Sequence, residues 1–301
     1  MPIGKSIRVY LADSTVAGIR YAELVNWTGQ AVACPRNRLS ELGSWPEAAK
    51  PGVYLLFEAR LGDSKPLAYI GESENVTERL TNHDRKKEFW NEVVIFSSKD
   101  ENLTKAHVKF LESALAGLAK QADRYELENG NTPTESSLPR ADRDAMAEFI
   151  ENIRMVLGTL GYPILEPLLK QSSVPHTHSQ QTQGQVQVSK DPIDLTFRVN
   201  DVTAFGAVTD EGFVLKKGSQ VAKSNTDSAG VKVAKLKEQL LAEGRLAPQG
   251  DRLVLAEDLL VSSSSYAAAI VAGTSRSGPQ SWVAADGRTL KAIEDAQIAN
   301  A

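Results

Sequence analysis

The sequence predicts a mixed α+β protein built from two domains. In both halves of the chain, short strand-like runs alternate with segments whose apolar residues recur at helical spacing. A polar stretch from Lys170 to Lys190, rich in Gln, Ser, Thr and Pro, separates the halves. With 301 residues the chain is long enough to bury two cores. We expect a β extension over 1–50, a first domain over 51–168, a flexible linker over 169–192 and a second domain over 193–301.

The first 50 residues carry three strand-like runs. Ile7–Leu11 alternates apolar and polar residues, as a half-buried strand does. Gly18–Leu24 indicates a second strand, and Trp27–Gln30 supplies a turn before a third run at Ala31–Ala33. These runs predict a small β extension ahead of the first domain.

Two strands and a helix are expected next. Val53–Phe57 predicts a strand, and a turn at Gly62–Ser64 returns the chain as its hairpin partner, Leu67–Gly71. Asn75 is a good N-cap with an acidic residue, Glu78, three positions later, so a helix should run over 76–84.

The first domain ends with a strand and two helices. Glu92–Phe96 predicts the strand, and an amphipathic helix should follow over about 104–121. Glu112 lies on the shoulder of the apolar stripe of that helix, where a side chain at the lip of a cleft would lie. Asn129–Pro133 marks a loop, and a second amphipathic helix is expected over about 142–157.

The second domain should be a compact α+β unit. Its expected elements are a strand at Gly212–Leu215, a helix over about 228–243 closed by Gly244, a strand at Leu253–Leu255, and a short helix at Tyr266–Ala272 that Ser262–Ser265 cap and Gly273 ends.

The composition is that of a soluble globular protein, with 42 % apolar and 24 % charged residues. The single cysteine, Cys34, cannot form an internal disulfide, which favours a reducing compartment. The N-terminal residues lack the pattern of a secretory signal, and no apolar stretch approaches the roughly 20 residues of a membrane span. We expect a cytoplasmic protein with no membrane partner.

The net charge of −4 argues mildly against a nucleic-acid partner, because neutralising phosphates usually demands an excess of Lys and Arg. Arg85, Lys86 and Lys87 nevertheless form a local basic cluster that suits a phosphate backbone. A solvated helix end explains the cluster equally well. His176 and His178, in the linker, lack the further ligands that a metal site needs.

Several residues of the first domain suit phosphodiester hydrolysis, which needs an activated water and stabilisation of charge on the phosphate and leaving group. Glu112 is the candidate ligand for one hydrated Mg²⁺ or Mn²⁺, since Mg²⁺ accepts few protein ligands. Arg79 can grip a phosphate through two parallel hydrogen bonds. Tyr54 or Tyr69 would act as general base or orient the water, and His83, on the helix face of Arg79, would relay a proton.

Each of these residues has an ordinary alternative role. By itself, Glu112 is more typical of a solvated helix flank and Arg79 of a surface salt bridge, and His83 is equally typical of a surface histidine. The two tyrosines fit a core that keeps their hydroxyls at the sheet edge. For each residue taken singly, the ordinary role is favoured. The order and spacing of the residues taken together favour the functional roles instead.

The segment from Pro51 to Pro133 resembles the GIY-YIG nuclease family. Gly52-Val53-Tyr54 replaces the Gly-Ile-Tyr element conservatively, and Tyr69-Ile70-Gly71 matches the second element outright. Arg79 with His83 four residues later, and then Glu112, follow in the order and at the distances of the family pattern.

This resemblance implies a central antiparallel sheet flanked by helices. It also implies one divalent metal on Glu112, hydrolysis assisted by Tyr54 or Tyr69, and phosphate contact by Arg79. Glu72 departs from the pattern, because it adds a negative charge where several family branches carry a basic or small residue. The substrate-binding candidates are Gly71, Arg85, Lys86, Lys87 and Asn129, with Asn131 as the alternative for the asparagine of the family.

The second domain resembles DUF4357, a domain that recurs beside GIY-YIG cores. The resemblance is carried by Gly212–Ser219, by Ser262–Ala268, and by Trp282 with Asp286–Leu290. It implies an accessory that contacts DNA or selects the target, although small residues and serines also serve packing and capping.

Two hypotheses of different class follow. The first is a metal-dependent DNA endonuclease whose C-terminal domain assists target recognition; RNA or a small phosphate compound is the alternative substrate to DNA, because such a site contacts a phosphate rather than a sugar. The second is a catalytically silent scaffold that binds nucleic acid or protein, which the acidic net charge and Glu72 favour. The sequence does not predict the oligomeric state.

Overall fold

The computed structural model describes residues 4–59, 65–84, 87–129, 137–169 and 193–299. The chain divides into two compact units, Met1–Pro167 and Leu168–Ala301. Several sequence predictions lie outside the described residues: the turn at Gly62–Ser64, the basic pair Arg85 and Lys86, Asn131, and the linker histidines His176 and His178.

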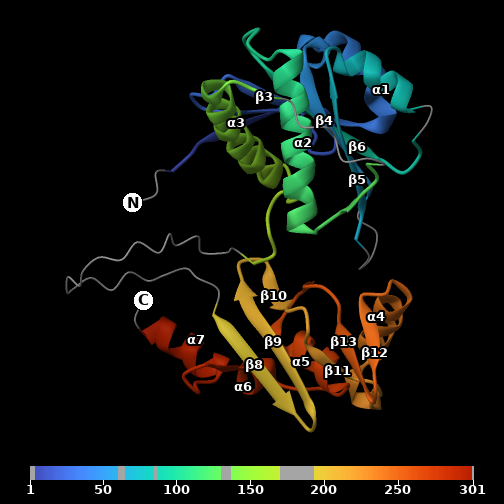
Figure 1. Ribbon diagram of the computed structural model, residues 1–301, viewed down its shortest axis with the longest axis vertical. Coiled ribbons are helices and arrows are strands. Elements are labelled where there is room, and N and C mark those ends of the chain that lie inside the picture. Colours follow the sequence, from blue (N-terminus) through green and yellow to red (C-terminus); the bar gives the residue numbers. More distant parts are fainter. Residues whose placement is uncertain (1–3, 60–64, 85–86, 130–136, 170–192, 300–301) are drawn as a thin grey trace, which may run out of the picture. The chain divides into compact units, whose positions relative to one another are not determined.

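The described strands of the N-terminal unit form one mixed sheet (Figure 1). Neighbouring strands pair antiparallel, except that β5 and β7 run parallel. Because β3 pairs with β6 along its whole length, the expected β extension continues this sheet, and the expected boundary at residue 50 falls inside the unit. In spatial order the strands are β1 (Ile7–Leu11), β2 (Arg20–Leu24), β3 (Gly29–Pro35), β6 (Glu92–Ser98), β4 (Gly52–Phe57), β5 (Leu67–Ser73) and β7 (Glu126–Leu127).

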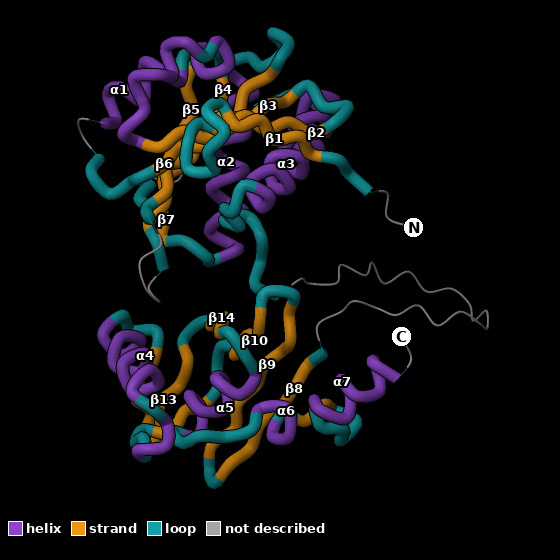
Figure 2. The backbone as a smooth tube through the Cα atoms, turned by 180° about the vertical axis from the view of Figure 1, so that it is seen from behind, coloured by secondary structure: helices purple, strands orange, loops and turns teal. Residues whose placement is uncertain are grey.

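Helices cover both faces of this sheet (Figures 1 and 2). The helices α2 (Lys105–Ala122) and α3 (Arg140–Thr159) pack on one face, against Val53, Leu55 and Phe57 of β4. The helix α1 (Val76–Asp84) and the 3₁₀ segments η1 (Arg36–Ser44) and η2 (Pro46–Ala49) pack on the other, against Tyr54 and Leu56. Every residue of β4 is buried, which explains its continuous apolar run.

Local signals set the ends of the helices. The side chain of Asn75 accepts a hydrogen bond from the backbone N–H of Glu78 at 3.3 Å, so α1 begins where its cap predicts. The helix α2 ends at Asp123, whose backbone is left-handed at φ 53°. The helix α3 extends two residues beyond the expected 142–157 at each end, and Pro139 occupies its N-cap position without a side-chain hydrogen bond.

The C-terminal unit packs its helices around two sheets. Trp282 is fully buried between Phe197 and Phe213, and its indole N–H donates to the carbonyl of Ser264 at 2.9 Å. The strands are β8 (Asp194–Val199), β9 (Val202–Thr209), β10 (Gly212–Leu215), β14 (Leu259–Val261) and β15 (Val283–Ala284) in one sheet, and β11 (Gln220–Ala222), β13 (Arg252–Leu255) and β12 (Leu246–Gln249) in the other. The helices are α4 (Val231–Ala242), α5 (Ser264–Ala272), α6 (Gly278–Ser281) and α7 (Leu290–Ala299), with a 3₁₀ turn η3 (Asp227–Ala229).

None of the helices in the described ranges is both long enough and apolar enough to cross a membrane. The helix α3, with 20 residues, has the necessary length but alternates buried and charged exposed positions.

Candidate active site

Tyr54 and Tyr69 lie together on the face of the sheet that α1 covers. Tyr54 of β4 is opposite Gly71 of β5, and Leu56 is opposite Tyr69, so the two phenol rings occupy neighbouring positions on one face. Their ring centroids are 6.2 Å apart. Tyr54 is fully buried, whereas Tyr69 is only partly buried. Of the two candidate tyrosines, only Tyr69 therefore reaches the surface of the unit.

Arg79 links the two phenols. Its guanidinium hydrogen-bonds the hydroxyls of both Tyr54 and Tyr69, which also bond each other. Burial and the neighbouring Tyr69 raise the pKa of Tyr54, and the positive charge of Arg79 opposes this only in part. Tyr54 is therefore a neutral phenol at physiological pH. Arg79 is an exposed residue of α1, and its guanidinium carries more N–H donors than the two phenols use.

The motif glycines are explained by close approach. A Cβ atom on Gly71 would collide with the hydroxyl and ring of Tyr54, which lies directly across the strand pair. A Cβ atom on Gly52 would collide with the carbonyl of Phe96 in β6. Gly71 thus makes room for the buried phenol rather than offering a contact to substrate by itself.

Replacing Gly71 by alanine should lower the free energy of unfolding by about 1–3 kcal/mol, because the added methyl group overpacks the site and displaces Tyr54. Urea unfolding followed by tryptophan fluorescence would measure the loss. The matched control is Gly117→Ala on α2, where a Cβ meets no atom within 4 Å; it should be neutral or stabilising by about 0.5–1 kcal/mol. Equal midpoints for the Gly71 variant and the parent protein would show that the phenol does not occupy this space.

Glu112 reaches the same strand end from the opposite face of the sheet. Its helix, α2, packs on the face away from the phenols, but the Glu112 carboxylate accepts a hydrogen bond from the backbone N–H of Glu72 in β5. Gly71 lies opposite Tyr54, and Glu72 is the next residue of β5. This bond therefore holds Glu112 at the strand position directly after the one that faces Tyr54. The positive charge of Arg79 acts to lower the pKa of both Glu112 and Tyr54. The carboxylate and the phenols are therefore close enough to share one neighbouring cation.

Asn129 covers the outer edge of β5 beside this site. The strand β7 pairs with β5 only at Leu67 and Ala68. Two residues further along each strand, the Asn129 side chain accepts from the N–H of Ile70 at 3.1 Å and donates to its carbonyl at 2.7 Å. Asn129 thus fixes the edge of β5 between the two sides of the site, and its amide oxygen is already used there.

The Glu112 carboxyl is electrostatically unusual. Burial and the negative charge of Glu72 raise its pKa to about 7, while Arg79, the Glu72 backbone N–H and Lys109 act in the opposite direction. Glu112 is therefore roughly half protonated at neutral pH. A carboxyl held in this state beside a second carboxylate would gain from a divalent cation, which neutralises both.

Of the predicted basic cluster, Lys87 is the member that lies within the described residues, and its side chain already has partners. Lys87 donates to the Glu128 carboxylate at 2.5 Å and lies over the Tyr69 ring at 4.4 Å from its centroid. It is adjacent to the candidate site but neutralised by Glu128. His83 lies in the last turn of α1, four residues after Arg79.

The donor set fits a single hard cation held mainly by water. Within the described ranges no group of three or more His, Cys, Asp or Glu side chains gathers into a metal cluster. Glu112 with Glu72 nearby supplies carboxylate oxygens, the ligand type that Mg²⁺ and Mn²⁺ prefer, and Mg²⁺ usually takes only one or two of them from a protein.

Sequence reasoning identified the residues that meet here but not how they are held. Glu72 drew attention only as an extra negative charge, whereas its backbone N–H holds Glu112 in place. Glu128, which neutralises Lys87, gave no recognisable signal, because β6, α2 and β7 lie between the two residues along the chain. Asn129 stood out by residue type, and its edge-capping role follows only from the sheet order.

Comparison with known proteins identifies one domain. A family described as "Domain of unknown function (DUF4357)" matches residues 195–294, so the C-terminal unit carries a DUF4357 domain, as its sequence predicts. The match does not extend to the N-terminal unit, where the GIY-YIG resemblance rests on the motif residues alone. No curated protein and no solved structure shows a significant match to the chain.

Proposed function

We propose that the N-terminal unit is a metal-dependent endonuclease of the GIY-YIG type, which hydrolyses phosphodiester bonds of DNA, and that the DUF4357 domain assists target recognition. The observation that supports this most is the hydrogen-bonded group of Tyr54, Tyr69 and Arg79, whose arginine also acts on Glu112. These four residues come from two strands and two helices, and their charges and hydroxyls act on one another near the end of β5.

In this proposal each residue has a distinct task. Arg79, exposed and oriented by both phenols, binds a phosphate oxygen pair through its outer N–H groups. Tyr69, partly exposed, orients the attacking water, and the buried Tyr54 holds Arg79 and Tyr69 in position. Glu112 would hold Mg²⁺ or Mn²⁺, which supplies charge neutralisation at the phosphate and the leaving oxygen. His83, four residues from Arg79, would return a proton.

A catalytically silent scaffold is the second candidate. Two observations favour it: Tyr54 is too buried, and its pKa too high, to serve as a base, and Lys87 is neutralised by Glu128. Such a protein would keep the fold and the tyrosine–arginine group for binding alone. Metal binding separates the two candidates, because the scaffold has no need of a cation at Glu112.

Calorimetric titration with Mn²⁺ tests the proposal. The parent protein should bind one ion, and Glu112→Gln should lose that binding, whereas Glu148→Gln, on the exposed face of α3, should not. Metal competes with a proton on Glu112, whose pKa is raised to about 7, so binding should be about tenfold tighter at pH 8 than at pH 6 and should release a proton below pH 7. Glu72→Gln removes the charge that raises this pKa and should move the dependence to lower pH. If millimolar Mn²⁺ does not bind the parent protein, the scaffold is supported and the endonuclease is not.

A further inference from the structure

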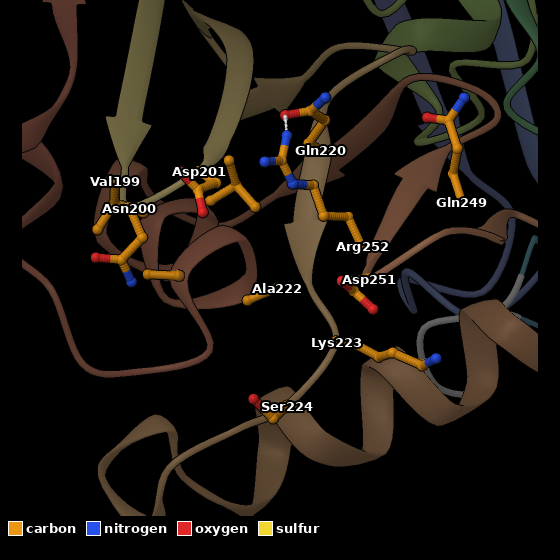
Figure 3. A pocket seen from close by; sticks show the side chains of 12 residues that line it. Val199, Asn200, Asp201, Gln220, Ala222, Lys223, Ser224, Gln249, Asp251 and Arg252 are labelled. Carbon is orange, nitrogen blue, oxygen red and sulfur yellow. Dashed lines mark hydrogen bonds between the residues drawn. The ribbon is translucent and has the colours of Figure 1, made fainter.

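A polar pocket of about 600 Å³ lies in the C-terminal unit (Figure 3). It is formed where the turn between β8 and β9, the end of β11 and the turn between β12 and β13 meet. Its volume is within the range of small-ligand sites, roughly 300–1,000 Å³. The polar side chains in its wall are Asn200, Asp201, Gln220, Lys223, Ser224, Gln249, Asp251 and Arg252.

Two cations stand in this wall without a carboxylate partner in the described part of the chain. The Arg252 guanidinium donates to the side-chain oxygen of Gln220 at 3.0 Å, and that oxygen also accepts from the backbone N–H of Thr203 at 3.0 Å (Figure 3). Gln220 therefore fixes the direction of Arg252 but leaves its charge uncompensated. Lys223 is exposed beside the same pocket. The two side chains point in different directions, Arg252 towards Gln220 and Lys223 away from it, so each offers a separate contact to an anion (Figure 3).

A third cation is buried directly behind the wall. Lys237 of α4 is 3 % exposed and donates to the carbonyl of Ala222 at 2.9 Å and to the side chain of Asn225 at 2.7 Å. Ala222, which accepts from Lys237, and Ser224, next to Asn225, both line the pocket. Both acceptors of Lys237 are neutral, and burial lowers its pKa to about 8, so at neutral pH an uncompensated ammonium group lies behind this surface. A buried charge of this kind is costly, and a bound anion would offset part of that cost.

The pocket also holds groups that a simple anion would not use. Asp201 and Asp251 lie on its rim and would repel free phosphate, but they accept hydrogen bonds from amino groups. The amides of Asn200 and Gln249 offer a donor and an acceptor each. The cations of the pocket can bind a phosphate, and its acids and amides can bind amino and carbonyl groups. A nucleotide carries all of these groups, because the edge of its base presents hydrogen-bond donors and acceptors. The described wall contains no aromatic side chain, so recognition here uses hydrogen bonds rather than stacking.

We propose that this pocket binds one nucleotide of a single-stranded nucleic acid, with its phosphate at Arg252, a neighbouring phosphate of the strand at Lys223, and its base edge at the acids and amides of the rim. This inference rests on the proposed function, in which the DUF4357 domain assists target recognition, and assigns the contact to a defined surface. A single strand is required because a base inside a duplex cannot present its pairing edge to a pocket.

Fluorescence anisotropy of the full chain with a labelled single-stranded 12-mer, in EDTA to prevent cleavage, tests the inference. The double variant Lys223→Ser/Arg252→Ser should bind at least about tenfold more weakly, and the slope of log affinity against log salt should fall by about 1.4. The matched control is Lys232→Ser/Lys235→Ser, which removes the same charge from exposed lysines of α4 outside the pocket. Its affinity should stay within about twofold of the parent protein, and circular dichroism should show that both variants are folded.

Three results would overturn the inference: equal losses for the two double variants, competition by duplex DNA as effective as by single strand, or no binding by the parent protein. Competition by a mononucleotide, but not by inorganic phosphate at the same concentration, would support recognition of base and phosphate together.

The outcome of this binding test is separable from the outcome of the test of the proposed function. If the pocket variant binds normally while Glu112→Gln abolishes cleavage, only the pocket assignment fails; if the pocket variant loses binding while Glu112→Gln cleaves normally, only the endonuclease fails.

Discussion

The Glu112→Gln variant should lose metal-dependent cleavage of DNA by about 10³-fold, which corresponds to about 4 kcal/mol of transition-state stabilisation. Glutamine has nearly the shape of glutamate and can still accept the N–H of Glu72, so the edge of β5 should keep its geometry. What the substitution removes is the negative charge that would hold the cation. A plasmid-nicking assay with Mg²⁺ or Mn²⁺ measures the loss.

Glu148→Gln provides the matched control for this experiment. Glu148 is an exposed glutamate on α3, away from β5, and its substitution should leave the rate unchanged. If Glu112→Gln and Glu148→Gln both cleave at the parental rate, Glu112 has no part in the reaction. Because the substituted carboxyl has a pKa raised by burial, Glu112→Gln should also stabilise the fold above pH 7, where the parent protein must keep a partly buried charge.

The Arg79→Lys variant should lose about 10²–10³-fold in cleavage rate, although it keeps the positive charge. Lysine cannot bond both phenol hydroxyls and a phosphate oxygen pair with a planar fork, so Tyr54 and Tyr69 lose their common donor. The same plasmid assay measures this, and unfolding in urea shows whether the fold is intact.

Arg140→Lys is the control, since Arg140 is an exposed arginine at the start of α3. A cleavage rate for Arg79→Lys equal to that of Arg140→Lys would show that charge alone suffices and that the tyrosine–arginine geometry has no catalytic role. A large loss in Arg79→Lys with unchanged Mn²⁺ affinity would assign the residue to phosphate rather than to the cation.

The N-terminal unit could be predicted from sequence wherever local signals were strong. The helix over 76–84 follows from the Asn75 cap, and the central strand from a continuous apolar run. The two 3₁₀ segments η1 and η2 escaped prediction, because their short turns carry no sustained period.

The C-terminal unit was predicted less completely. The sequence analysis found the helix closed by Gly244, whose φ is +71°, and the helix ended by Gly273, whose φ is +64°. It missed the hairpin of β8 and β9, although Leu195, Phe197 and Val199 alternate and an Asn-Asp pair follows them; Asn200, with φ 48°, makes that tight turn. The helix α7 was also missed.

The candidate site shows which features only three-dimensional structure supplies. Motif order predicted that Tyr54, Tyr69 and Arg79 come together, and they do. The hydrogen bond from the Glu72 backbone to Glu112 depends on β5 being at the edge of the sheet beyond Ile70. The point at which β5 becomes the edge strand depends on where β7 stops pairing with it, after Ala68. No residue pattern in the sequence specifies that point.

A crystal structure of the protein soaked in Mn²⁺, with an anomalous difference map, tests the central claim most directly. One strong peak is expected on the Glu112 carboxylate, at the end of β5 beside Glu72. A peak at another carboxylate, or none at millimolar Mn²⁺ with Glu112 still bonded only to the backbone of Glu72, would contradict it.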